Sequence, residues 1–217
     1  MSIRIIVADD HAIIREGLRV LLETQADMQV LAIAANGREA VKLVDKHQPQ
    51  VVIMDISMPE LNGVEAMQQM LARHPQLQVI VLSIHAAKPY ILRAMQAGAK
   101  GYLLKETAGL EVVDAIRAIQ RGERYLSRRV ADLLLDEAFQ KNGSSIETSA
   151  LDALSPRERE VLQLVAEGKT SHEIAAKLSL SSKSVDSYRS RLMQKIGVTD
   201  LAGLIRFAIQ NGVISIE

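Results

Sequence analysis

The chain has 217 residues, which is enough for one large or two small domains, since a typical domain has about 150 residues. Basic and acidic residues both number 26, so the formal net charge of zero excludes a protein that binds nucleic acid through overall basicity. Cysteine is absent, which excludes disulfides, thiolate zinc sites and cysteine nucleophiles.

The amino terminus carries only a short apolar run. Arg4 is followed by four apolar residues and then by two aspartates, which is too short a run for a signal peptide or a membrane span. A chain without cysteine also suits a reducing compartment. We therefore expect a cytoplasmic protein with no membrane partner.

Residues 1–121 alternate apolar runs of strand length with helical patterns. The runs cover residues 3–8, 28–34, 51–54, 78–82 and 101–104. A helical pattern follows each run, and the stripe predicted to face inward in the first consists of Ile13, Ile14, Leu18, Leu21 and Leu22. The fivefold alternation predicts an α/β fold with a doubly wound, five-stranded parallel sheet, in which ligands bind at the carboxyl ends of the strands.

The remaining residues divide into a connecting segment and a helical domain. Residues 122–150 contain one amphipathic helix and then a polar, non-periodic stretch over 142–149, which predicts a flexible linker. Residues 151–217 show no strand pattern. Helical patterns over 156–167, 171–178, 182–196 and 200–211 predict a small all-α domain.

Polar residues follow four of the five apolar runs. Asp9 and Asp10 come after the first run, Asp55 after the third, Ser83 after the fourth and Lys105 after the fifth. Each of these alone is more often a solvated loop residue. Because the carboxyl ends of parallel strands meet at one edge of a sheet, we expect all five to lie together.

This set of residue types favours phosphoryl transfer. Three carboxylates repel one another unless a cation binds, and oxygen ligands with bound water are what Mg²⁺ prefers. The loop after Asp55 contains a proline and a glycine and could aim the backbone carbonyl of Ser57 at the metal. Lys105 and the hydroxyl of Ser83 would bind phosphoryl oxygens, which predicts Asp55 as the phosphoryl acceptor.

Residues 1–121 resemble the receiver domain of two-component response regulators. The matching motifs are Asp9-Asp10, Asp55 with Met58-Pro59 and Gly63, Ser83, and Gly101-Tyr102-Leu103-Leu104-Lys105. The resemblance implies a flavodoxin-like fold and phosphorylation of Asp55 from the phosphohistidine of a cognate histidine kinase. It also implies that Asp10 and Asp55 bind Mg²⁺ directly, that Asp9 helps through water, and that Lys105 pairs with the phosphoryl group.

The resemblance further implies a switch, in which Ser83 moves toward the phosphoryl group and Tyr102 changes rotamer. Two positions depart from the family. Many receivers have proline after the lysine, often in a cis bond, whereas here Glu106 follows; because a cis bond before another residue costs about 3 kcal/mol, we expect a trans bond. The residue after the serine is usually small, and we expect Ile84 to restrict access to Asp55 and slow phosphorylation or hydrolysis.

The pattern over residues 171–196 predicts a helix-turn-helix. A short helix and a turn lead into a second helix with one buried stripe and a polar face. Residues 182–196 include four basic residues and one acidic residue, a net charge of +3. An exposed basic face is often only solvated, but hydroxyl residues among bases also suit contacts to phosphates and base edges. The candidate DNA contacts are Lys183, Ser184, Asp186, Ser187, Ser190, Arg191 and Lys195.

Residues 151–214 resemble the LuxR-type helix-turn-helix domain of NarL/FixJ response regulators. The matching segments are residues 154–162, 167–170, 173–175, 184–185 and 195–198. Many members have lysine where this chain has Asp186, so the operator sequence does not transfer from relatives. The last helical stripe is most simply core packing, but the resemblance implies that this helix also pairs two domains on DNA, through Leu201, Leu204 and Ile205.

Together these features predict a DNA-binding response regulator that is phosphorylated on Asp55 and regulates transcription as a homodimer on double-stranded promoter DNA. We expect no enzymatic activity beyond the receiver's part in its own phosphorylation and dephosphorylation. A phosphatase of the haloacid dehalogenase type is an alternative, but it needs an acid two residues after the nucleophile, where this chain has Ser57. A regulator that works without phosphorylation is a second alternative, which labelling by a kinase or acetyl phosphate would discriminate.

Overall fold

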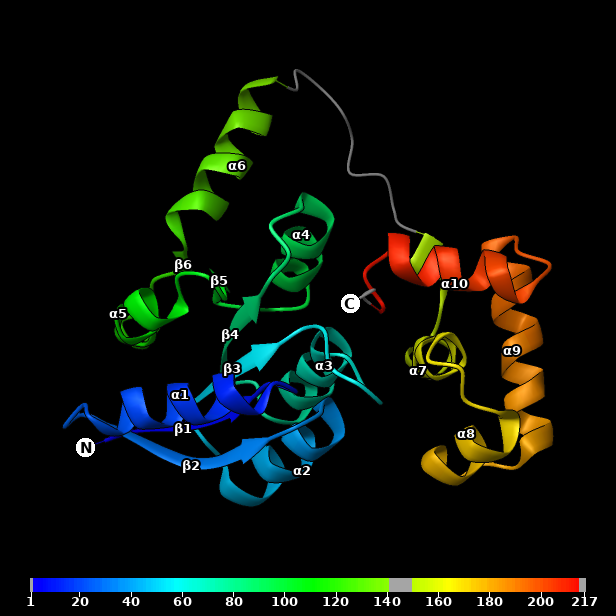
Figure 1. Cartoon of the computed structure of the whole chain (residues 1–217), viewed down its shortest axis with the longest axis horizontal. Coiled ribbons are helices and arrows are strands. Elements are labelled where there is room, and N and C mark those ends of the chain that lie inside the picture. The colour runs from blue at the N-terminus through cyan, green and yellow to red at the C-terminus, as the bar shows by residue number, and fades with distance from the viewer. Residues whose placement is uncertain (1, 141–149, 215–217) are drawn as a thin grey trace. The chain divides into compact units, whose positions relative to one another are not determined.

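The computed structural model describes residues 2–140 and 150–214, which fall into two compact units, residues 1–143 and 144–217 (Figure 1). The predicted linker over 142–149 lies outside the described residues. In the described parts of the chain, no helix combines the length and the apolar character needed to cross a membrane.

The first unit contains a parallel sheet in the order β2-β1-β3-β4-β5-β6. The strands are β1 (Ile3–Ala8), β2 (Met28–Ala34), β3 (Val51–Asp55), β4 (Gln78–Ser83), β5 (Gly101–Leu104) and β6 (Tyr125–Leu126). Every pairing between neighbours is parallel. The doubly wound parallel fold is therefore confirmed.

The predicted number of five strands is wrong, because β6 adds a sixth. This strand has two residues, Tyr125 and Leu126, which pair with Gly101 and Tyr102 of β5. Two residues are too few to produce a periodic pattern, so the sequence gives no strand signal there. The helix α6 (Arg128–Gln140) follows, and its Val130 is buried in the core of the first unit. Part of the predicted connecting segment thus packs as an extension of this unit.

Helices cover both faces of the sheet (Figure 1). The helices α1 (Ala12–Glu23) and α5 (Ala108–Gln120) pack on one face. The other face is covered by α2 (Gly37–His47), α3 (Gly63–Arg73) and α4 (Lys88–Gln96). All residues of β3 and β5 are buried as a result, which explains why their sequences are apolar without alternation.

One residue of the predicted inward stripe of α1 faces solvent. Leu18 and Leu22 are buried in the core as predicted, but Ile13 is 87% exposed. Successive helical residues are about 100° apart, so Ile13 lies roughly a third of a turn from the mean direction of the other four stripe residues. The inclusion of Ile13 in the stripe is therefore wrong.

The second unit is helical, as predicted. It contains the short 3₁₀ helix η1 (Ala150–Ala153) and the helices α7 (Pro156–Ala166), α8 (Ser171–Leu178), α9 (Ser182–Ile196) and α10 (Leu201–Gln210). Ser155 and Thr170 begin α7 and α8 with capping boxes, each completed by a glutamate three residues later. The helix α8 ends at Ser179, whose φ of 54° is left-handed and turns the chain toward α9.

Candidate functional site

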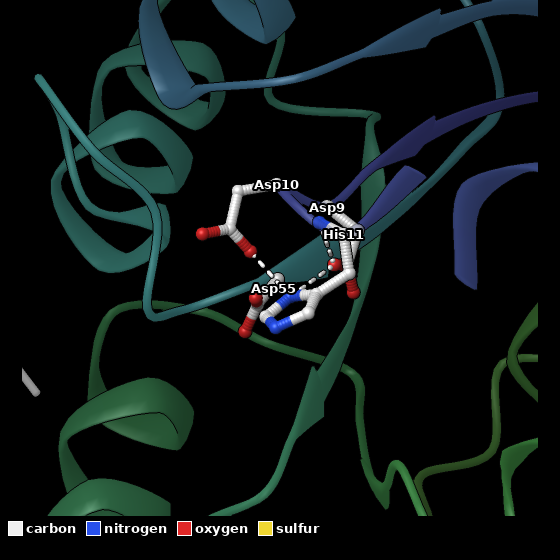
Figure 2. A group of neighbouring side chains, drawn as sticks. All are labelled: Asp9, Asp10, His11 and Asp55. Carbon is white, nitrogen blue, oxygen red and sulfur yellow. Dashed lines mark hydrogen bonds and ion pairs between the residues drawn. The ribbon is translucent and has the colours of Figure 1, made fainter. Parts of the chain in front are cut away.

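Strand register brings the three aspartates of the first unit together. Ala8 pairs with Met54 across β1 and β3, so Asp9 and Asp10 leave the sheet beside Asp55 at the end of β3. Figure 2 shows the carboxylates turned toward one another. One ligand atom from each of Asp9, Asp10, His11 and Asp55 lies within 4.8 Å of all the others.

Lys105 balances part of this charge. Its backbone N–H donates to the carbonyl of Ser83 at 2.9 Å, which continues the pairing of β4 with β5 beyond the strands. Its ammonium lies 2.8 Å from Oδ2 of Asp9 and 2.8 Å from Oδ2 of Asp55. Burial lowers the pKa of Lys105, but the two carboxylates outweigh burial and the pKa is raised overall. The lysine is therefore a fixed positive charge beside Asp55.

Asp55 itself is almost fully buried. Burial raises the pKa of Asp55; Lys105 opposes this and the nearby Asp9 adds to it, and the pKa is raised overall. The backbone N–H of Ser57 donates to Oδ1 of Asp55 at 3.1 Å. The loop after Asp55 returns very close to it, because a Cβ on Gly63 would lie 1.9 Å from the Asp55 carbonyl oxygen. Only glycine fits there.

The donor set fits a divalent cation. Asp9, Asp10 and Asp55 carry three negative charges and Lys105 one positive charge, which leaves two negative charges with His11 neutral. Oxygen ligands of this kind, two of them on buried side chains, are those that Mg²⁺ prefers. The predicted backbone carbonyl ligand at Ser57 stays a prediction.

Ser83 and Tyr102 meet at the backbone of His85. Ser83 is buried, and its Oγ accepts a hydrogen bond from the His85 N–H at 3.0 Å. The Tyr102 hydroxyl donates to the His85 carbonyl at 2.7 Å, and burial raises the pKa of Tyr102 to about 12. The His85 ring stacks on Tyr90 with centroids 4.2 Å apart, and its Nε2 lies 3.1 Å from Oγ of Ser57. Burial and then Lys105 lower the pKa of His85.

Sequence reasoning missed two histidines at this pocket. His85 follows Ser83 by two residues, and nothing in its neighbours marks it. His11 directly follows the acidic pair, which was the available signal. Its Nδ1 lies 2.6 Å from Oδ1 of Asp10 and 3.2 Å from Oδ1 of Asp9 (Figure 2).

The two departures from the receiver pattern have structural outcomes. No cis peptide bond occurs among the described residues, so the Lys105–Glu106 bond is trans, as predicted. Glu106 forms an ion pair with Arg129 at 3.0 Å. Ile84 is 59% exposed, and its expected effect on access to Asp55 stays a prediction.

The candidate DNA contacts lie mostly on the exposed side of α9. Val185 and Leu192 are buried in the core of the second unit. The remaining face carries the exposed side chains of Lys183, Asp186, Ser187, Ser190 and Arg191, with Ser184 half-buried. The Arg191 guanidinium lies 5.2 Å from the centre of the Tyr188 ring, within the range of a cation–π contact.

Two of the candidates also make contacts with other elements of the unit. The Ser171 hydroxyl donates to Oδ1 of Asp186 at 2.7 Å and joins α8 to α9. The Lys195 ammonium lies 2.7 Å from Oε2 of the buried Glu158 and 3.2 Å from the carbonyl of Ala153. A DNA contact by Lys195 therefore competes with an ion pair that holds α9 against α7.

The predicted dimer residues of α10 are not equally accessible. Leu201 is 45% exposed and Ile205 is half-buried. Leu204 is fully buried and packs in the core of the unit. The part of Leu201, Leu204 and Ile205 in a dimer therefore stays a prediction, and Leu204 packs within its own unit.

Comparisons with known proteins match both units. The sequence matches the family described as response regulator receiver domain over residues 5–117, and the family described as bacterial regulatory proteins, luxR family, over residues 152–208. The transcriptional regulatory protein MctR of Rhizobium johnstonii is 35% identical and matches 99% of this chain and 96% of its own length.

Solved structures are similar too. A LuxR-family two-component response regulator from Aurantimonas is 34% identical with a TM-score of 0.62, covering 64% of this chain and 99% of its own. RcsB of Salmonella enterica serovar Typhimurium, solved on promoter DNA with the phosphomimetic BeF3⁻, is 28% identical with a TM-score of 0.60, covering 98% of this chain and all of its own.

Proposed function

The chain belongs to the response regulators that join a receiver domain to a LuxR-type helix-turn-helix domain, and from this premise we propose that a histidine kinase phosphorylates it on Asp55. Members of this family regulate transcription by binding DNA, and this chain matches them over nearly its whole length. The observation that carries the proposal is the Lys105 ammonium, 2.8 Å from both Asp9 and Asp55. A fixed cation beside the acceptor carboxylate supports binding of phosphoryl oxygens.

In the proposed reaction, a carboxylate oxygen of Asp55 attacks the phosphorus of the kinase's phosphohistidine. A P–O bond forms, the P–N bond breaks, and the leaving imidazole takes up a proton. Lys105 donates to one phosphoryl oxygen while the Ser83 hydroxyl, from the next strand end, donates to another. These donors stabilise the negative charge on the transferred group through hydrogen bonds and form no covalent bond to it.

Mg²⁺ completes the proposed site. Asp10 and Asp55 would hold it directly, Asp9 through a water, and the backbone carbonyl of Ser57 would be a further ligand. When bound, the ion offsets the negative charge of the phosphoryl oxygens. The two uncompensated negative charges of the pocket support this assignment.

The proposed output is binding of a homodimer to double-stranded promoter DNA in the cytoplasm. Phosphorylation moves Ser83 and Tyr102, and the surface around α4 and β5 changes with them. Two copies then meet through Leu201, Ile205 and their neighbours on α10. Each copy contacts DNA through the exposed face of α9, which includes the exposed basic residues Lys183 and Arg191. RcsB, which is solved bound to promoter DNA and as dimers on DNA, supports the binding of a dimer to DNA.

Substitution of the acceptor tests the proposal. The variant Asp55→Asn should lose all labelling by acetyl phosphate or by a phosphorylated histidine kinase, while its circular dichroism stays that of the wild type. Asp45→Asn is the matched control, because Asp45 pairs with Arg73 and His74 on the surface. This control should label like the wild type. Labelling that persists in Asp55→Asn, or a wild type that takes no label, contradicts the proposal.

A further inference from the structure

His11 lies in the acidic pocket, yet the proposed phosphorylation makes no use of it. We propose that Nδ1 of His11 is a direct ligand of the divalent cation held by Asp9, Asp10 and Asp55. The pocket then favours ions that accept nitrogen ligands, such as Mn²⁺ and Co²⁺, over Mg²⁺. The inference rests on the proposed function only in taking the same carboxylates as the metal site.

The ring of His11 points at the carboxylates. Nδ1 lies 3.2 Å from Oδ1 of Asp9, with the geometry of a hydrogen bond from an Nδ1–H (Figure 2). It also lies 2.6 Å from Oδ1 of Asp10, an oxygen that is buried without a hydrogen-bond partner among the described residues. In neutral imidazole that N–H lies along the direction in which a deprotonated Nδ1 carries its lone pair. A deprotonated Nδ1 therefore turns its lone pair toward the side of the pocket where these carboxylates lie.

The backbone fixes this orientation. The N–H of His11 donates to Oδ1 of Asp9 at 2.8 Å, which ties the residue to the acid pair. His11 also stands at the N-cap position of α1, where side chains commonly bond to the backbone N–H groups of the first turn. Its side chain makes no such cap hydrogen bond. The ring is thus directed into the pocket and not toward its own helix.

Ligand chemistry decides which ions benefit. Mg²⁺ binds oxygen and keeps several waters, so an imidazole adds little to its affinity. Imidazole suits Mn²⁺ less than Co²⁺ or Ni²⁺ in the usual affinity order, but all three accept it. Lys105 Nζ lies 3.4 Å from Nδ1 and 2.8 Å from Oδ2 of each of Asp9 and Asp55, so the lysine approaches the carboxylates through their other oxygens.

Electron paramagnetic resonance of Mn²⁺ added to the full chain tests the proposal. The wild type should show electron spin-echo modulation from a directly bound ¹⁴N nucleus, which should change when histidine is labelled with ¹⁵N. His11→Asn should lose this modulation. His11→Asn should also lower the affinity for Mn²⁺ by about tenfold or more, since loss of even an indirect partner of a metal costs 10–100-fold in affinity. The affinity for Mg²⁺ should fall less, so the preference for Mn²⁺ over Mg²⁺, measured by competition, should fall.

His74→Asn is the matched control, because His74 also lies beside an aspartate, with Nε2 2.8 Å from Asp45. It should keep both the modulation and the ion preference. Bound Mn²⁺ without nitrogen modulation in the wild type overturns the inference, and this measurement stands even when His11→Asn fails to fold. An unchanged ion preference in folded His11→Asn, or equally tighter binding of both ions, overturns it as well. A wild type that binds no divalent ion overturns both this inference and the proposed magnesium site.

Discussion

Lys105 is the cation that allows two buried carboxylates to share one edge of the sheet. Asp9 is fully buried and Asp55 almost so, and the lysine pairs with both. One positive charge cannot balance two negative ones, so burial still raises the pKa of Asp55. The charge of Asp55 is thus buried at a cost in folding free energy. A bound cation or a bound phosphoryl group can change that cost.

This cost predicts how stability depends on pH. Because the pKa of Asp55 is raised on folding, the folded state binds its proton more tightly and the free energy of unfolding falls as pH rises above the ordinary value of 3.8. Asp55→Asn removes the charge and leaves Lys105 paired with Asp9. It should therefore stabilise the receiver at neutral pH, by on the order of 1 kcal/mol, in urea unfolding with EDTA present.

The gain from Asp55→Asn should shrink as pH falls toward 4. Asp27→Asn provides a control of opposite sign, because the Arg117 guanidinium lowers the pKa of Asp27. A carboxyl with a lowered pKa contributes stability at neutral pH that is lost in acid, so this variant should lose stability at pH 7 and approach the wild type in acid. A stabilising effect of Asp55→Asn that is independent of pH would contradict the account.

Ile84 follows the buried Ser83 and is itself mostly exposed. An apolar side chain at this position should hinder the approach of water to phosphorylated Asp55. Ile84→Ala should therefore shorten the lifetime of the phosphorylated form, measured as loss of radioactive label with time. Val20→Ala, at an exposed apolar position on α1, should leave the lifetime unchanged. Equal lifetimes in wild type and Ile84→Ala would refute the effect.

At the scale of elements, a buried glutamate and a lysine join α7 to α9 in the helical unit. Glu158 completes the capping box of α7 and is buried, and Lys195 of α9 pairs with it. Burial raises the pKa of Glu158, but Lys195 and the Ser155 hydrogen bonds outweigh burial and lower it overall. The ionised glutamate thus joins a helix start to the neighbouring helix.

Removing the lysine should therefore cost stability more than DNA affinity. Lys195→Met leaves the Glu158 carboxylate with its capping bonds but without its cation. The helical unit should lose about 1 kcal/mol, because a hydrogen bond to a charged group contributes about 1.5–3 kcal/mol and solvent screens the part-exposed lysine. Thermal unfolding followed by circular dichroism measures this loss. Lys183→Met, at an exposed position on the same helix, should leave the melting temperature unchanged. An unchanged melting temperature together with weaker DNA binding in Lys195→Met would assign Lys195 to DNA instead.

The elements show what the sequence can predict and where it stops. Helices and strands of normal length follow from periodicity and caps, so α8 and α9 begin and end as predicted. The two-residue β6 is too short for any pattern. The contact of Lys195 with Glu158 joins residues that only the fold brings close. Leu204 illustrates the same limit, because the apolar stripe of α10 does not show which of its residues pack in the core and which stay at the surface.

At the scale of the whole molecule, charge is balanced overall but concentrated locally. Residues 182–196 carry a net charge of +3 within a chain whose formal charge is zero. DNA affinity should therefore depend on where a charge lies and not on the sum. A substitution that changes the net charge outside α9 separates the effect of net charge from the effect of where the charge lies.

The double variant Lys183→Ala with Arg191→Ala should weaken binding to promoter DNA and reduce its salt dependence. For each DNA phosphate that no longer pairs with a basic side chain, the slope of log affinity against log salt should become less steep by about 0.9. Lys42→Ala with Lys46→Ala removes the same two charges from the exposed side of α2 and should change neither quantity. Fluorescence anisotropy at several salt concentrations measures both. An equal weakening in the two double variants would mean that net charge, and not the face of α9, holds the DNA.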